Sequence, residues 1–136
     1  DCSRLFGLQL RLALLGRSKE EICAVRPSGL LAPTVEAIAS GTYKLKAREQ
    51  IKGVGYCVPS LEAALWCFWN TDSYEQAVLA ATNLGYDADT TAAICGQLAG
   101  AHYGVHSIPE HWLGRLAQRG EIERLADDLL RTRIRA

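Results

Sequence analysis

A run of small residues between Ala92 and Gly104 constrains the fold of this chain more than any other segment. The run carries no formal charge and consists largely of alanine and glycine. Within it, Ala92, Gly96, Gly100 and Gly104 recur at four-residue spacing, which places them along one stripe of an α-helix. Glycine inside a helix costs about 1 kcal/mol relative to alanine, so such a stripe is expected where another backbone packs closely. The sequence therefore predicts a buried helix here.

Two carboxylates, Asp87 and Asp89, precede this helix, and Thr90 follows them directly. On a regular helix, residues two apart point about 200° away from each other, so the carboxylates converge only if the helix starts at about Asp89 or Thr90. The positive end of the helix dipole offsets part of their repulsion. Their oxygens suit Mg²⁺, Mn²⁺ or Ca²⁺ better than zinc. In the alternative interpretation, Asp89 is a helix cap and Asp87 an ordinary turn residue, since such pairs are common before helices.

The longest stretch without helical periodicity runs from Tyr43 to Val58. It is rich in lysine and arginine and then contains Gly53, Gly55 and Tyr56. Glycines let a backbone approach a ligand closely, and the tyrosine ring offers an aromatic face to a base. This pattern favours a substrate-binding loop. A solvated basic loop is the alternative, and both interpretations stay open at this point.

Hydrophobic periodicity and capping signals predict helices along almost the whole chain and no pair of strands. The expected helices cover residues 1–15, 18–27, 33–41, 61–70, 73–85, 89–104, 109–117 and 121–133. In the last of them, the apolar residues Ile122, Leu125, Leu129 and Leu130 are expected to face inward. We therefore predict a single all-α domain or fragment spanning 1–136, a compact multi-helix bundle of about seven or eight helices.

Composition excludes several classes of protein. The formal net charge is zero, so nothing indicates a nucleic-acid partner. No apolar run is long enough for a transmembrane helix, so no membrane partner is expected. The five cysteines include no Cys-x-x-Cys pair, and we interpret them as small apolar residues in a reducing cytoplasm. His102, His106 and His111 form no ligand pattern, and His102 is expected to be a core residue with its hydrogen bonds satisfied.

The segment Gly85-Tyr-Asp-Ala-Asp-Thr-Thr-Ala-Ala-Ile94 and the glycine stripe after it resemble the metal-binding signature of the ADP-ribosylglycohydrolase family, which includes dinitrogenase-reductase-activating glycohydrolases. The segments Gly53–Trp66 and Ile108–Trp112 resemble two further segments of that family. The resemblance covers nearly the whole chain but only the C-terminal half of the family's usual length. Tyr86 stands where the family usually has a second glycine, so the turn or the width of the pocket differs here.

The resemblance implies the C-terminal part of the ADP-ribosylglycohydrolase fold and a hydrolase that cleaves the glycosidic bond between ADP-ribose and a protein side chain or small acceptor. It implies that Asp87, Asp89 and Thr90 bind metal, with two Mg²⁺ (or Mn²⁺) ions in the complete protein. It also implies that Gly53, Gly55 and Tyr56 line the ADP-ribose pocket. The family's remaining metal ligands, a Thr-Asp-Asp segment and a glutamate, belong to its N-terminal half and do not occur here, and no catalytic base can be named.

We therefore expect this chain to be incomplete alone. Its partners would be an ADP-ribosylated protein or small-molecule conjugate and either the missing N-terminal half or a second copy. That second partner would cover an apolar face around Leu5, Leu8 and Leu12 or along the glycine stripe. Two alternatives are a non-enzymatic protein on the same scaffold, as the lens crystallins of this family illustrate, and an unrelated helical module with a calcium-stabilised turn.

Overall fold

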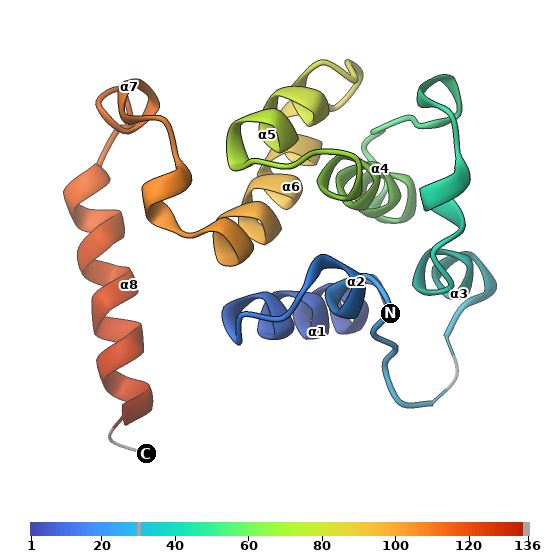
Figure 1. Cartoon of the computed structure of the whole chain (residues 1–136), viewed down its shortest axis with the longest axis horizontal. Helices are drawn as coiled ribbons and strands as arrows, with labels where there is room; N and C mark the ends of the chain where they lie inside the picture. Colours follow the sequence, from blue (N-terminus) through green and yellow to red (C-terminus); the bar gives the residue numbers. More distant parts are fainter. Residues whose placement is uncertain (30, 135–136) are drawn as a thin grey trace.

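The computed structural model describes residues 1–29 and 31–134 of the chain, which form an all-α fold as predicted (Figure 1). Within these residues there are eight α-helices and three short 3-10 helices. The α-helices are α1 (Cys2–Leu14), α2 (Lys19–Ile22), α3 (Pro33–Ala39), α4 (Cys57–Trp69), α5 (Tyr74–Thr82), α6 (Ala88–Tyr103), α7 (Glu110–Leu113) and α8 (Arg119–Ile134). The 3-10 helices are η1 (Thr42–Leu45), η2 (Arg48–Gln50) and η3 (Val105–Ser107).

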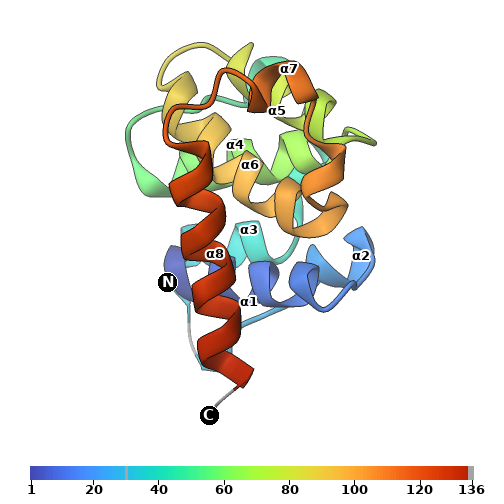
Figure 2. The same ribbon diagram turned by 90° about the vertical axis from the view of Figure 1, so that its left-hand side faces the viewer.

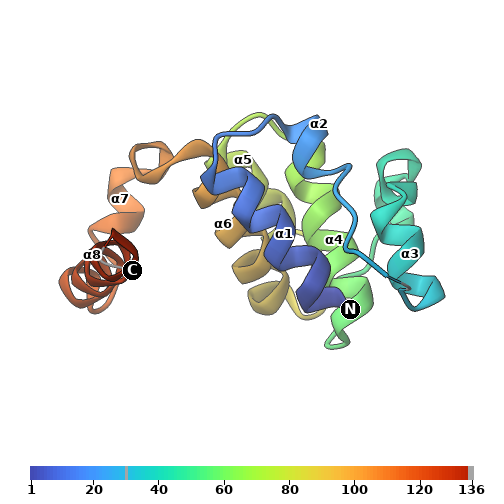
Figure 3. The same ribbon diagram turned by 90° about the horizontal axis from the view of Figure 1, so that it is seen from below.

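The body of the molecule is built around α6, which packs against α5, α4 and α1 (Figures 1 and 3). Helix α1 crosses α4 and α6 on one side, while α5 lies along α6 on the other. The largest fully buried side chains in this body include Leu5, Tyr43, Leu65, Phe68 and Leu98. Each apolar side chain of this size contributes about 1.5–3 kcal/mol when it leaves water, so these contacts hold the body together.

Two glycines of the α6 stripe face α5. A Cβ atom added to Gly96 would lie 3.6 Å from both Tyr74 Oη and Val78 Cγ2, and one added to Gly100 would lie 3.7 Å from Tyr74 Cε2. The glycines thus meet side chains of α5 at ordinary van der Waals distance, and the predicted close approach of another backbone is not seen. Ala92, Gly96 and Gly100 are half-buried, and Gly104 is exposed. The fully buried residues of α6 occupy the adjacent face and are Thr91, Cys95, Leu98 and Ala99.

Helix α4 begins at Cys57, four residues before the predicted start of this helix at residue 61. Pro59 lies in the first turn, where a missing backbone N–H needs no partner and the proline ring is tolerated. The first helical hydrogen bond runs from the Ser60 N–H to the Tyr56 carbonyl at 3.1 Å. Proline thus lies inside the helix, and Tyr56 caps it.

Two helices, α2 and α7, are single turns and are shorter than predicted. The capping box at the start of α2 is confirmed, since Ser18 Oγ accepts from the Glu21 N–H at 3.2 Å and the Glu21 carboxylate accepts from the Ser18 N–H at 2.9 Å. Helix α7 ends before Gly114, and Gln118 then adopts a left-handed conformation (φ 59°) that turns the chain into α8. Local capping signals thus predict where helices start better than where they end.

The predicted orientation of α8 is wrong. Its apolar residues are exposed rather than inward, from 48% for Ile122 and Leu125 to 74% for Leu129. Helix α8 stands apart from the body in Figures 1 and 3, and Figure 2 views the molecule from its side. Periodicity reports that a helix is amphipathic, but it does not report whether another element of the described chain covers the apolar side.

The apolar face expected on α1 is only partly open. Leu5 is fully buried against the body, which contradicts its expected exposure, while Leu8 and Leu12 are half-buried. Leu14 and Leu15, at the far end of the helix, are the exposed residues. Across the described residues, every helix is too short or too polar to cross a bilayer.

His102 lies near the C-terminus of α6 and packs edge-on against Phe68 and Tyr103, with ring centroids 5.4 and 4.7 Å away. Burial, together with the nearby Lys19 charge, lowers the pKa of His102. The expectation of a core-packed histidine agrees with these contacts. Its hydrogen bonding is incomplete, because His102 Nδ1 is buried without a partner in the part of the chain that the structure describes.

Candidate metal and substrate site

The turn between α5 and α6 is built from two consecutive residues in the left-handed conformation. Gly85 has φ 76° and Tyr86 has φ 56°, after which Asp87 caps α6 with φ −88° and ψ 62°. Glycine adopts this conformation freely, whereas a tyrosine there is strained by about 1–2 kcal/mol. The Tyr86 side chain is 69% exposed. The helix starts at Ala88, so Asp87 lies outside it and Asp89 inside its first turn.

This geometry brings the two carboxyl groups together. The Asp87 side chain interacts with that of Asp89 and is the main cause of the lowered pKa of Asp89. The backbone N–H groups of Thr90 and of Asp89 itself lower this pKa further. Asp89 therefore stays ionised well below neutral pH, at the positive end of the α6 dipole.

The loop that carries Gly53, Gly55 and Tyr56 packs directly against this acidic turn. The Asp87 N–H donates to the Gly53 carbonyl at 2.9 Å. A Cβ atom on Gly55 would lie 3.4 Å from Asp87 Oδ2, so the loop backbone borders the carboxylate. Tyr56 caps α4 immediately afterwards, with a side chain that is 65% exposed. Segments predicted separately as metal-binding and substrate-binding are therefore neighbours in space.

Gly53 is required by the way the loop and α6 fit together. An added Cβ atom would overlap Thr91 Oγ1 and lie 3.1 Å from Thr91 Cβ. Thr91 is fully buried, and its hydroxyl has no hydrogen-bond partner within the described residues. Ser60 Oγ donates to the Val54 carbonyl and fixes the other side of the loop. The loop is thus held by α4 and α6 together.

The residues present fit a hard dication. Asp87, Asp89 and Thr90 offer carboxylate and hydroxyl oxygens, Asp89 and Thr90 are exposed, and the loop backbone approaches without a side chain in the way. The site is not a full ligand set, however. Among the residues that the structure describes, no three of His, Cys, Asp and Glu come together as a metal site. The metal-binding assignment of Asp87, Asp89 and Thr90 stays a prediction, as does the substrate-binding assignment of Gly53, Gly55 and Tyr56.

The basic side chains before the glycine loop are mostly engaged within the fold. Lys44 Nζ lies 4.1 Å from the centroid of the Trp69 ring, Lys46 pairs with Glu62 at 2.6 Å, and Arg48 donates to the Asn83 carbonyl at 2.9 Å. Lys44 and Lys46 are half-buried and help to position the segment, whereas Arg48 stays exposed, so the solvated-loop interpretation remains open for it. Their spacing in the sequence gave no signal of these partners.

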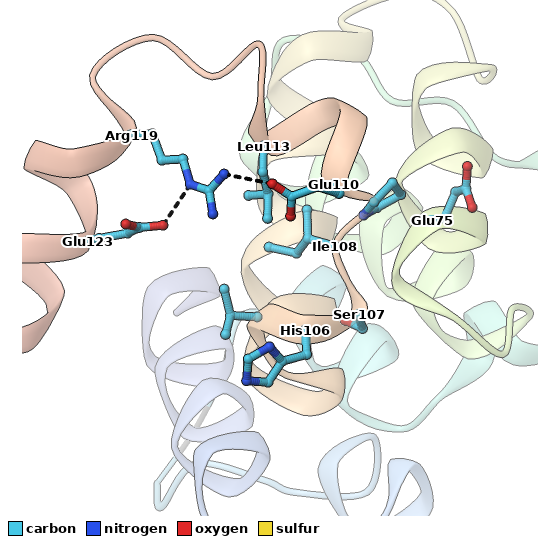
Figure 4. Close-up of a pocket in the computed structure, with 10 residues that line it drawn as sticks. Glu75, His106, Ser107, Ile108, Glu110, Leu113, Arg119 and Glu123 are labelled. Carbon is cyan, nitrogen blue, oxygen red and sulfur yellow. Dashed lines mark hydrogen bonds and ion pairs between the residues drawn. The ribbon is translucent and has the colours of Figure 1, made fainter.

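One cavity lies away from the acidic turn, beside the C-terminal end of α6. It measures about 550 Å³ and is lined by Glu75 of α5 and by residues of the segment from η3 to α8 (Figure 4). On its rim, Arg119 donates to Glu110 at 3.1 Å and to Glu123 at 2.8 Å. It contains no residue predicted for either site. Because its lining and that of the acidic turn share no residue, we treat this cavity as separate from the candidate site.

The fold has a close counterpart among solved structures. The chain matches an "ADP-ribosylglycohydrolase-related protein complex" with a TM-score of 0.85 and 40% identity, over 92% of this chain and 44% of the other.

Sequence comparisons define the family. Residues 3–136 match the model of the ADP-ribosylglycohydrolase family, and the chain belongs to that family. It is 46% identical over 129 residues to an ADP-ribosylarginine hydrolase Tri1 of Pseudomonas putida (strain GB-1), covering 95% of this chain and 34% of the relative. It is 42% identical over 77 residues to the ADP-ribosyl-[dinitrogen reductase] glycohydrolase of Rhodospirillum rubrum, covering 55% of this chain and 26% of that protein. The chain thus spans about a third of the length of the curated relatives it matches most extensively.

Proposed function

We propose that this chain forms part of a metal-dependent ADP-ribosyl hydrolase that cleaves the bond between ADP-ribose and an arginine side chain. The observation that carries the proposal is the contact between the acidic turn and the glycine loop, through Asp87, Gly53 and Gly55. Arginine is proposed as the acceptor because two relatives named ADP-ribosylarginine hydrolase are 46% and 43% identical over almost the whole chain.

In this proposal, each segment has a distinct task. Asp87, Asp89 and Thr90 would hold Mg²⁺ or Mn²⁺, as one part of a two-ion site. A bound dication would stabilise charge as the anomeric bond breaks. The glycine loop lets substrate approach the carboxylates, and the exposed Tyr56 ring offers a stacking face to the adenine base. Asp89, already ionised, supplies the negative charge that retains the cation.

The remaining ligands would come from chain outside these residues. Two ions of this kind need about six oxygen ligands each, whereas the acidic turn supplies two carboxylates and one hydroxyl. The relatives are also about three times longer than this chain. We therefore expect the 136-residue chain alone to be almost inactive. We also propose that the complete enzyme acts in the cytoplasm.

The test is release of ADP-ribose from an ADP-ribosylarginine substrate in Mg²⁺ buffer. We compare this chain with a longer protein that adds the N-terminal part found in its relatives. The longer protein should turn over substrate and bind metal, and Asp89→Asn should abolish both. The matched control is Glu123→Gln on α8, which should change neither. Strong turnover by this chain alone would show that the ligand count is wrong.

The alternative is a non-enzymatic protein on the same scaffold. A folded longer protein that binds metal but releases no ADP-ribose would support it.

A further inference from the structure

Two of the five cysteines meet at the surface although they are far apart in sequence. Cys2 is the first residue of α1, and Cys57 is the first residue of α4. Both line one small apolar cavity of about 170 Å³, together with Ser3, Phe6, Leu61 and Ile94. Cys57 is exposed and Cys2 is half-buried, whereas the other three cysteines are buried. The fold therefore places one accessible thiol next to one sheltered thiol.

The two thiols lie on the wall of the same cavity, which is small enough to keep them close together. Burial raises the pKa of Cys2, and the neighbouring Cys57 side chain raises it further. Each cysteine is the first residue of its helix, where the backbone is held by fewer hydrogen bonds than in the interior. Small shifts of both helix ends can thus bring the sulfurs to the bonding distance of about 2.0 Å.

We propose that Cys2 and Cys57 are a redox modification site, forming a reversible disulfide when the protein meets a peroxide. The exposed Cys57 reacts first: its sulfur takes one oxygen atom from the peroxide, giving a sulfenic acid and, from hydrogen peroxide, one water. The Cys2 sulfur then attacks the Cys57 sulfur, the S–O bond breaks, and the hydroxyl leaves as a second water with the Cys2 proton. Both sulfurs are oxidised by two electrons in total, and the peroxide is reduced by two.

The remaining cysteines should not compete. Burial raises the pKa of Cys67 to about 12 and that of Cys95 to about 12, so both stay protonated at neutral pH. Burial also raises the pKa of Cys23. Thiolates rather than thiols react with peroxides, and buried thiols are inert as well as inaccessible. These three residues serve as internal controls.

The disulfide would have a local consequence. Cys57 directly follows Tyr56 and the glycine loop, so the bond would tie that loop to the start of α1. This inference does not depend on the proposed enzyme activity, because the oxidation involves only the two thiols and a peroxide.

The test is peptide mapping of the folded 136-residue chain after a small molar excess of hydrogen peroxide at neutral pH. Remaining thiols are blocked with N-ethylmaleimide, and the chain is cleaved after lysine, arginine and glutamate, which places every cysteine in a separate peptide. We expect free thiols to fall from five to three. We also expect peptide 1–4 to be linked to peptide 53–62, with the link lost after dithiothreitol.

Two variants complete the test. Cys57→Ser should leave the other four thiols free at the same peroxide dose, and Cys2→Ser should leave Cys57 oxidised without an intramolecular link. The proposal is overturned if Cys57 of the wild-type chain reaches sulfinic acid while Cys2 remains a free thiol. A link between the buried cysteines, or no thiol loss, overturns it equally, and neither result depends on the folding of a variant.

Discussion

The acidic turn and α8 are both charged, solvent-facing parts of this molecule, but they are held in opposite ways. The turn is anchored by segments distant in sequence, through the bond from Asp87 to Gly53 and the fit of Thr91 against that glycine. The charges of α8 pair mostly within the helix, as Arg119 does with Glu123 and Arg124 with Asp128. Surface pairs one turn apart contribute only about 0.3–0.5 kcal/mol each. Position in the fold, rather than charge, therefore distinguishes the candidate site.

The largest expected contrast concerns leucines in the body and on α8. Leu98→Ala should lower the free energy of unfolding by about 2–5 kcal/mol, because it removes a fully buried side chain of α6. Leu129→Ala, on the exposed side of α8, should change it by less than about 0.5 kcal/mol. Urea unfolding followed by tryptophan fluorescence measures both. Equal losses would mean that α8 is covered in solution.

A second contrast compares two glycines. Gly53→Ala should destabilise the chain by about 1–3 kcal/mol, because the new methyl group overlaps Thr91. Gly120→Ala, in the first turn of α8, meets nothing within 4 Å and should be neutral or stabilising by up to about 1 kcal/mol. Thermal unfolding of the two variants beside wild type decides this. A harmless Gly53→Ala would show that the loop does not pack on α6 as described.

The smallest effect expected is a pH dependence from the C-terminal end of α6. Because the pKa of His102 is lowered, the unfolded chain binds a proton first as pH falls. The contribution of neutral His102 to the free energy of unfolding should thus be fully present above the ordinary histidine pKa of about 6.5. It should be lost as the pH falls from there through the lower pKa of the folded state. Urea titrations between neutral and mildly acidic pH measure this slope. His102→Gln should reduce this pH dependence, whereas His106→Gln, at an exposed position, should leave it unchanged. Identical slopes in the wild type and both variants would show that His102 is not the source of the pH dependence.

Features encoded by neighbouring residues were predictable from the sequence. The capping box at Ser18 and the all-α class both follow from spacing over a few residues. The predicted helix start at about Asp89 or Thr90 is one or two residues late, since α6 starts at Ala88 and Asp87 rather than Asp89 is its N-cap.

Features that join distant segments were not predictable in this way. Nothing in the spacing of Gly53 and Thr91 indicates that one fills the space beside the other, and the same holds for the cavity that Cys2 and Cys57 share. The exposed side of α8 was not predictable either, since Leu129 and Leu130 have the periodicity of core residues and are nevertheless exposed. The packing of segments distant in sequence determines which residues are buried and which come into contact.

The most direct test of the candidate site is to add Mn²⁺ to the ¹⁵N-labelled chain and record which backbone amide signals broaden. We expect losses confined to residues 53–57 and 86–91, abolished by Asp89→Asn, because carboxylates meet an open loop backbone there. Helix α8 carries four carboxylates, Glu121, Glu123, Asp127 and Asp128, and its signals should remain sharp. Broadening centred on α8, or broadening near Asp87 that survives Asp89→Asn, would contradict the assignment of the acidic turn as the metal site.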